Sequence, residues 1–173
     1  MSASPVTNTP PAIDAGTLET VLQEAVEAVL ETCSLQLDRH YVPLPDFAAA
    51  GAGDEGVWYG SSIDLSAGGG RWELSLLGER AAVEELARTM FALEPNEAVG
   101  EADLADALNE VVNVAAGVLK SYRLDAGQRL AIGLPSFHAE PAHLLAHGHH
   151  QQFLDRHGHR LRVLVRWREG DPT

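Results

Sequence analysis

The pattern of apolar and polar residues predicts three helices. In three segments of the chain, apolar residues recur every three or four positions, which is the period of an amphipathic helix. These segments run from Leu18 to Cys33, from Glu79 to Phe91 and from Asp103 to Lys120, and Gly127 ends the region in which the third can continue. Cys33 lies on the apolar side of the first segment, so we interpret it as a core residue and not as a nucleophile.

Strands are predicted where apolar and polar residues alternate with a period of two. A glycine-rich turn at 68–70 joins the first pair into a hairpin, and a His-Gly-His turn at 157–159 joins the last pair. The stretch 137–146 fits neither period. The expected strands are Val57–Ser66, Arg71–Leu77, Gln128–Gly133, Gln151–Asp155 and Arg160–Arg168.

This order of elements predicts an α+β fold, with a mainly antiparallel sheet and two long helices on one of its faces. Residues 1–12 are rich in Ser, Thr and Pro, which is typical of a disordered tail. Residues 41–56 are rich in Pro, Ala and Gly and are expected to form a loop, with room for a short extended piece before Pro43. A length of 173 residues suits a single domain, which we place at 13–170.

Composition narrows the classes of function. The formal net charge of −13 argues against general binding of nucleic acids or of anionic membranes. Cys33 is the only cysteine, so an internal disulfide is impossible and a reducing compartment fits. The N-terminal residues lack a basic segment followed by an apolar one, and no apolar run approaches the roughly 20 residues of a membrane span. We therefore expect a cytoplasmic protein.

The segment Asp103–Lys120 combines an apolar side with an unusual polar stripe. Placed at about 100° per residue, Asp106, Glu110, Asn113 and Gly117 fall within a stripe roughly 60° wide. Asn is disfavoured in a helix by up to about 0.7 kcal/mol relative to Ala and Gly by about 1 kcal/mol. One interpretation is a solvated face, with a glycine where another element packs closely. The other is a functional site, where local preferences are most often violated.

The spacing D-x-x-x-E-x-x-N-x-x-x-G of this stripe resembles the phosphatase motif of the CheC/CheX/FliY family, whose members dephosphorylate response-regulator receiver domains in bacterial chemotaxis. One copy on one long helix resembles the CheX branch, since CheC-type members usually carry two copies and the first helix here has no E-x-x-N. The stretch AIGLPSFHAE, from Ala131, is loosely similar to the segment that follows the motif helix in that family. The resemblance implies a CheC/CheX-like fold.

The implied reaction is hydrolysis of phospho-aspartate on a phosphorylated receiver. The receiver supplies a Mg²⁺ ion and a lysine, so this chain needs no cofactor and no metal of its own. The missing part is a positioned water, and positioning dominates phosphoryl transfer. An amide donates and accepts hydrogen bonds without charge, which suits Asn113 to hold that water. Glu110 would be repelled by the phosphoryl group and should instead meet a cation, which the resemblance identifies as the receiver lysine.

Three neighbours are expected to support this catalytic pair. Asp106 extends the docking surface, or holds Glu110 or a neighbouring backbone group, and Gly117 lets the receiver approach the helix closely. Asn109 stands where the family usually has glycine, so it either adds a polar contact or narrows the approach. The hypothesis requires Glu110 and Asn113 to face outward.

Other interpretations remain open. The same stripe suits a non-catalytic adaptor that binds receivers, and a structural or metal-sensing domain is a third alternative. A histidine-rich segment offers metal ligands, but no cysteine or correctly spaced carboxylate accompanies it, which favours solvated loop and edge histidines. A row of arginines on the last strand is interpreted as a solvated face or a guarded edge, or else as a contact to an acidic receiver or a second subunit. CheX-like proteins dimerise, which leaves a homodimer open. The histidines are His143, His147, His149, His150, His157 and His159, and the arginines are Arg160, Arg162, Arg166 and Arg168.

Overall fold

The computed structural model describes residues 13–44, 56–67, 69–125, 127, 129–146 and 148–170. The predicted tail at 1–12, most of the loop expected at 41–56, Gly68 of the first hairpin and His147 lie outside the described residues. The elements are α1 (Ala15–Leu37), β1 (Tyr41–Pro43), β2 (Trp58–Ala67), β3 (Gly70–Glu79), α2 (Arg80–Phe91), α3 (Glu101–Asp125), β4 (Ala131–Ile132), β5 (Ser136–His138), α4 (Ala142–Leu145), β6 (His149–Asp155) and β7 (Arg160–Glu169).

The strands form a single antiparallel sheet in the order β1-β6-β7-β3-β2-β4, with β5 also paired to β2. Two short strands therefore share one long neighbour: β4 pairs with Leu65–Ser66 and β5 pairs with Gly60–Ser62. Between β4 and β5 the ladder partners of β2 are interrupted over the three residues Gly133–Pro135, although the N–H of Gly133 still donates to the carbonyl of Asp64 on β2. Proline has no N–H to donate to the ladder, which accounts for the break in pairing at this point.

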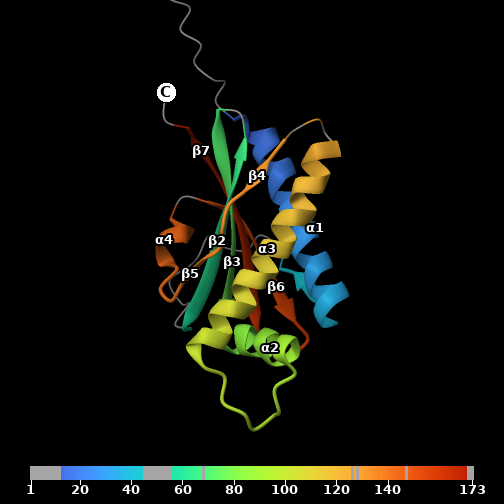
Figure 1. The fold of residues 1–173 in the computed structure, drawn as a ribbon, viewed down its shortest axis with the longest axis vertical. Coiled ribbons are helices and arrows are strands. Elements are labelled where there is room, and N and C mark those ends of the chain that lie inside the picture. The colour runs from blue at the N-terminus through green and yellow to red at the C-terminus, as the bar shows by residue number, and fades with distance from the viewer. Residues whose placement is uncertain are drawn as a thin grey trace, which may run out of the picture.

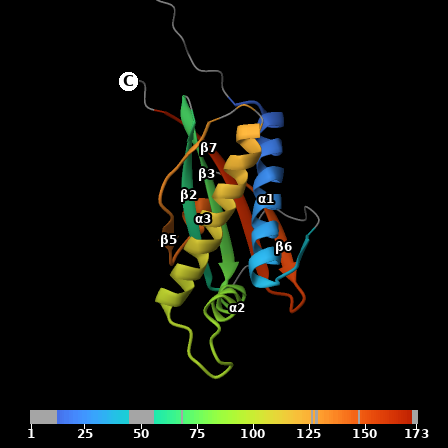
Figure 2. The ribbon, with the colours of Figure 1, turned by 45° about the vertical axis from the view of Figure 1, so that its right-hand side comes forward.

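The two long helices lie side by side on one face of the sheet, and α2 closes its end (Figures 1 and 2). Ion pairing links α1 to α3, since Arg123 Nη1 lies 3.0 Å from a carboxylate oxygen of Glu24. Apolar side chains of α1, α2, α3 and the facing side of the sheet form the main core. The predicted fold class is confirmed, including the position of both long helices.

The opposite face of the sheet is partly covered by α4 (Figure 1), whose Leu144 packs against Leu77 and Leu164. The stretch 137–146 fitted neither period because it contains the end of β5 and a single turn of helix, both too short to show one. Within the described residues of the expected strand Gln128–Gly133, only Ala131–Ile132 forms a strand, and Gln128 lies outside the described residues. Single turns and two-residue strands are set by their neighbours, so periodicity does not reveal them.

The arginine row lies on this second face and is not the solvated surface that the sequence predicts. Arg162 is only 3% exposed and lies over the ring of Trp58, at 4.4 Å from the ring centroid. Arg166 donates to Glu73 at 2.7 Å, and Arg168 also bonds Glu73. Paired carboxylates and covering side chains allow these cations to lie in a half-buried face.

Cys33 is buried in the core, as predicted. Burial disfavours the thiolate and raises the pKa of the thiol to about 12. The side chain therefore behaves as a small apolar residue at neutral pH. No helix in the described ranges is both long enough and apolar enough to cross a bilayer.

Candidate functional site

The position of the polar stripe follows from where α3 begins and from which of its sides is buried. The N–H of Gly100 donates to Oδ2 of Asp103 at 2.8 Å, and the carbonyl of Gly100 accepts from the N–H of Leu104. A side chain that reaches back to the residue before the helix satisfies an otherwise unpaired N–H, and the acids of the first turn suit the positive end of the helix dipole. The apolar side of α3 is then buried against α1, α2 and the sheet. It comprises Leu104, Ala107, Leu108, Val111, Val112, Ala115, Ala116 and Leu119.

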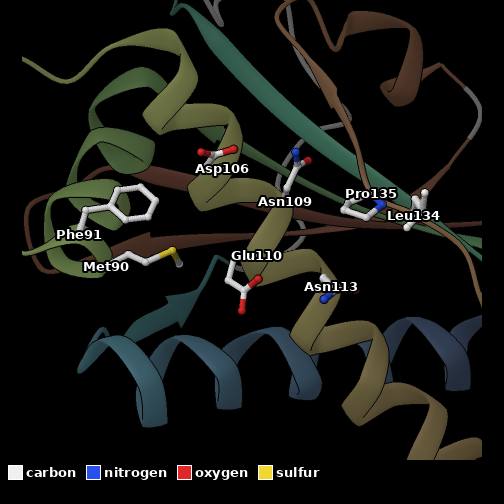
Figure 3. A pocket seen from close by; sticks show the side chains of 8 residues that line it. All are labelled: Met90, Phe91, Asp106, Asn109, Glu110, Asn113, Leu134 and Pro135. Atoms are coloured by element: carbon white, nitrogen blue, oxygen red, sulfur yellow. The ribbon is translucent and has the colours of Figure 1, made fainter.

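The stripe faces outward. Asp106, Glu110 and Asn113 are exposed, and their side chains point away from the sheet (Figure 3). Within the described part of the chain, none of the three forms a hydrogen bond or an ion pair with another side chain. Glu110 and Asn113 lie one helical turn apart, which places their polar groups on neighbouring positions of the same surface. The structure therefore brings the two predicted catalytic residues together and leaves both open to a partner.

These side chains form the floor of a groove of about 490 Å³. The floor consists of Asp106, Asn109, Glu110 and Asn113 of α3. One wall is the C-terminal end of α2, with Met90 and Phe91, and the other is the loop between β4 and β5, with Leu134 and Pro135 (Figure 3). A polar floor between two apolar walls is the usual composition of a recognition site.

Asn109 lies beside the polar stripe and has a different role from the residues of the stripe. Its Oδ1 accepts a hydrogen bond of 2.7 Å from the hydroxyl of Ser61, which lies on β2 and is 0% exposed. A buried hydroxyl requires such a partner. Asn109 therefore ties α3 to the sheet, and this contact turns its amide away from Glu110 and Asn113. Asn109 therefore lines the groove, but its amide oxygen is already bonded to Ser61.

Stability measurements test this tie. Asn109→Ala should lower the free energy of unfolding by about 1–2 kcal/mol relative to Asn113→Ala, because it leaves the Ser61 hydroxyl buried without a partner. Both substitutions replace Asn by Ala in the same helix, so the gain in helix propensity cancels between them. Urea unfolding of the two variants gives the difference. Equal stability would show that the Ser61–Asn109 bond contributes nothing.

Gly117 is not required by packing inside the chain. A Cβ built on it would meet no described heavy atom within 4 Å beyond the backbone of its own helix. The interpretation that a neighbouring element packs closely on this glycine is therefore wrong for the described residues. Gly117 instead leaves a bare stretch of helix surface one turn beyond Asn113.

The two apolar walls were not predicted as parts of a site. Leu134 is 90% exposed and Phe91 is 40% exposed, and both rank among the few large apolar side chains that reach the surface. One feature of the sequence could have indicated the Leu134 wall: a leucine stands between Gly133 and Pro135, in a loop where polar residues are usual. The end of α2 gave none, because Phe91 also fits the apolar period of its helix.

The histidines do not form a rival site in the part of the chain that the structure describes. His138 and His143 contact each other at 5.0 Å between ring centroids, and His159 Nδ1 lies 3.1 Å from Asp155 Oδ2. No group of three or more possible metal ligands converges among the described residues. These histidines belong to strands, turns and the second face of the sheet.

The chain matches one protein family in sequence and in fold. The family model described as "Chemotaxis phosphatase CheX" matches residues 59–155, which is more than half of the chain and includes all of α3. The chain belongs to the CheX family. No curated protein sequence matches it.

Solved structures agree on the fold at low sequence identity. A CheX from Desulfovibrio desulfuricans is 13% identical with a TM-score of 0.65, and the match covers 86% of this chain and 99% of that one. A CheX–CheY–BeF3–Mg²⁺ complex from Borrelia burgdorferi gives 16% identity and a TM-score of 0.66, with 86% and 98% covered. The FliY of Thermotoga maritima gives 14% identity and a TM-score of 0.54, with 93% of each chain covered.

Proposed function

We propose that this protein is a phosphatase that hydrolyses phospho-aspartate on a response-regulator receiver domain. The observation that carries the proposal is that Glu110 and Asn113 lie side by side on the floor of a groove. Both are exposed, and neither has a partner among the described residues. The family is described as a chemotaxis phosphatase. A structurally similar CheX forms a complex with CheY, BeF3 and Mg²⁺.

In the proposed reaction Asn113 positions the attacking water. Its amide oxygen accepts a hydrogen bond from the water, or its NH₂ group donates one, and either holds the water oxygen in line with the bond that breaks. The water oxygen forms a bond to phosphorus while the bond from phosphorus to the aspartyl oxygen breaks. The products are inorganic phosphate and a free aspartate, and the protons of the water pass to these anions. Because the amide is neutral, it approaches the phosphoryl group without repulsion.

Glu110 acts on the partner and not on the phosphoryl group. Its carboxylate lies one turn from Asn113 and has no cation beside it among the described residues, so it can pair with the lysine of a receiver's active site. That ion pair would set the orientation in which Asn113 meets the phosphoryl group. Asp106, one turn before Glu110, adds negative charge to the same surface. Mg²⁺ is expected on the receiver, where it neutralises phosphoryl oxygens.

Phosphate release from loaded receivers tests the proposal. Receivers from the same genome are purified, phosphorylated with acetyl phosphate in Mg²⁺ and freed of excess donor. The protein should then accelerate phosphate release from at least one of them, because a fixed water removes most of the entropic cost of the attack. Binding without acceleration would identify an adaptor, and neither binding nor acceleration with any receiver would exclude both functions.

A further inference from the structure

The walls of the groove have no role in the chemistry, yet they expose apolar surface beside the catalytic pair. We propose that Leu134 and Phe91 are the contacts by which this protein selects its receiver, each packing against an apolar side chain beside the receiver's phosphorylation site. This inference rests on the proposed function and adds the residues that determine partner choice. Single exposed apolar side chains are common, but apolar side chains that line one groove beside a polar floor are typical of an interaction site.

Leu134 is held in place despite its exposure. The N–H of Gly133 donates to the carbonyl of Asp64 on β2 at 2.8 Å, and a Cβ at Gly133 would lie 3.3 Å from that oxygen. Pro135 follows with a fixed φ angle. The strands on both sides, β4 and β5, pair with β2. These contacts hold the backbone on both sides of Leu134, so little backbone entropy is lost when a partner covers the loop.

Phe91 is held in a comparable way at the other wall. It is the last residue of α2, and the following residue, Ala92, adopts a left-handed conformation that ends the helix. The carbonyl of Arg88 accepts a hydrogen bond from the N–H of Leu93 at 3.0 Å. The guanidinium of Arg88 also donates to the carbonyl of Glu94 at 2.9 Å, which fixes the chain as it leaves the helix. Hydrogen bonds thus hold the backbone of both walls against the rest of the fold.

The charge on the floor of the groove determines which kind of partner can bind there. Asp106 and Glu110 place two carboxylates on the floor, and no cation pairs with them among the described residues. An occupant must therefore bring positive charge to the centre and apolar surface to both sides. A receiver offers a lysine at its active site, surrounded by loops. A free acyl phosphate is small and anionic, so it would be repelled by the floor and would leave the walls uncovered.

Steady-state dephosphorylation kinetics with the responsive receiver test the inference. Leu134→Ala should raise KM about tenfold, because truncating an anchor that is buried on binding typically costs that much affinity. Phe91→Ala should act in the same direction, and Leu134→Met should keep most of the affinity. In each variant kcat should change little, because the chemistry lies on α3. Acetyl phosphate alone should not be hydrolysed.

Leu35→Ala is the matched control, since Leu35 is 76% exposed on α1 and does not line the groove. Its KM should equal that of the wild type. If Leu134→Ala and Phe91→Ala also keep the wild-type KM, the inference is overturned while the phosphatase function stands. If the wild type accelerates no receiver, the proposed function itself fails, so the two failures are distinct. A thermal unfolding curve for Leu134→Ala should match the wild type, because this side chain contributes almost nothing to the core.

Discussion

Replacing Asn113 by alanine is expected to lower the rate of receiver dephosphorylation on the order of a hundredfold, because the attacking water is then no longer held in line. Binding should change little, since the amide acts on the water and not on the receiver. The measurements are single-turnover phosphate release at saturating receiver and equilibrium binding of a receiver carrying BeF3⁻, a stable mimic of the phosphoryl group. The rate constant should fall and the Kd should stay within a factor of two or three.

The structure makes this variant easy to interpret. Asn113 is exposed and has no hydrogen-bond partner among the described residues, so its truncation leaves no buried group unsatisfied. Asn113→Asp serves as a second variant with nearly the same shape. Its added negative charge faces the phosphoryl group, so it should impair both hydrolysis and binding. Equal loss of binding and hydrolysis in Asn113→Ala would count against a water-positioning role.

Reversing the charge of Glu110 is the second large effect, and Glu110→Lys should abolish receiver binding. The carboxylate is proposed to pair with the receiver lysine, so a lysine in its place turns attraction into repulsion at the centre of the contact. Such a reversal should weaken binding on the order of a hundredfold or more. Titration calorimetry with the BeF3⁻-loaded receiver measures it. Glu110→Gln removes the charge without repulsion and should bind with intermediate affinity.

A matched control separates this local effect from a change in net charge. Glu140→Lys makes the same substitution at an exposed residue that precedes α4 and does not line the groove. It should bind the receiver as the wild type does. A Glu110→Lys protein that still bound tightly would refute the proposed ion pair. Loss of binding in both variants would instead indicate a long-range charge effect, which added salt should reduce.

The placement of Glu110 and Asn113 could be predicted from sequence because it depends on one helix alone. The apolar side of α3 is long and regular, so a step of about 100° per residue was enough to place the opposite stripe at the surface. Asn109 belongs to the same segment, but its role depends on Ser61, 48 residues earlier in the chain. Packing between a helix and a distant strand does not appear in local periodicity, so that role could not be predicted.

The walls of the groove were missed for a related reason. The position of Leu134 beside the groove depends on the pairing of β4 and β5 with β2. Those short strands are defined only by that pairing. The arginines of β7 were predicted on a solvated face because their partners Trp58 and Glu73 are distant in sequence. Sequence reasoning therefore succeeded where a property belongs to one element and failed where it arises between elements.

Strand β2 is bonded both to the helix that forms the floor of the groove and to the loop that forms the Leu134 wall. Ser61 on this strand anchors the helix that carries Asn113, and the carbonyl of Asp64 anchors the loop that carries Leu134. A substitution at position 134 therefore alters the contact surface without shifting Asn113. If the proposed function holds, a lineage could exchange one signalling partner for another through single changes at Leu134 while the placement of Asn113 is inherited intact.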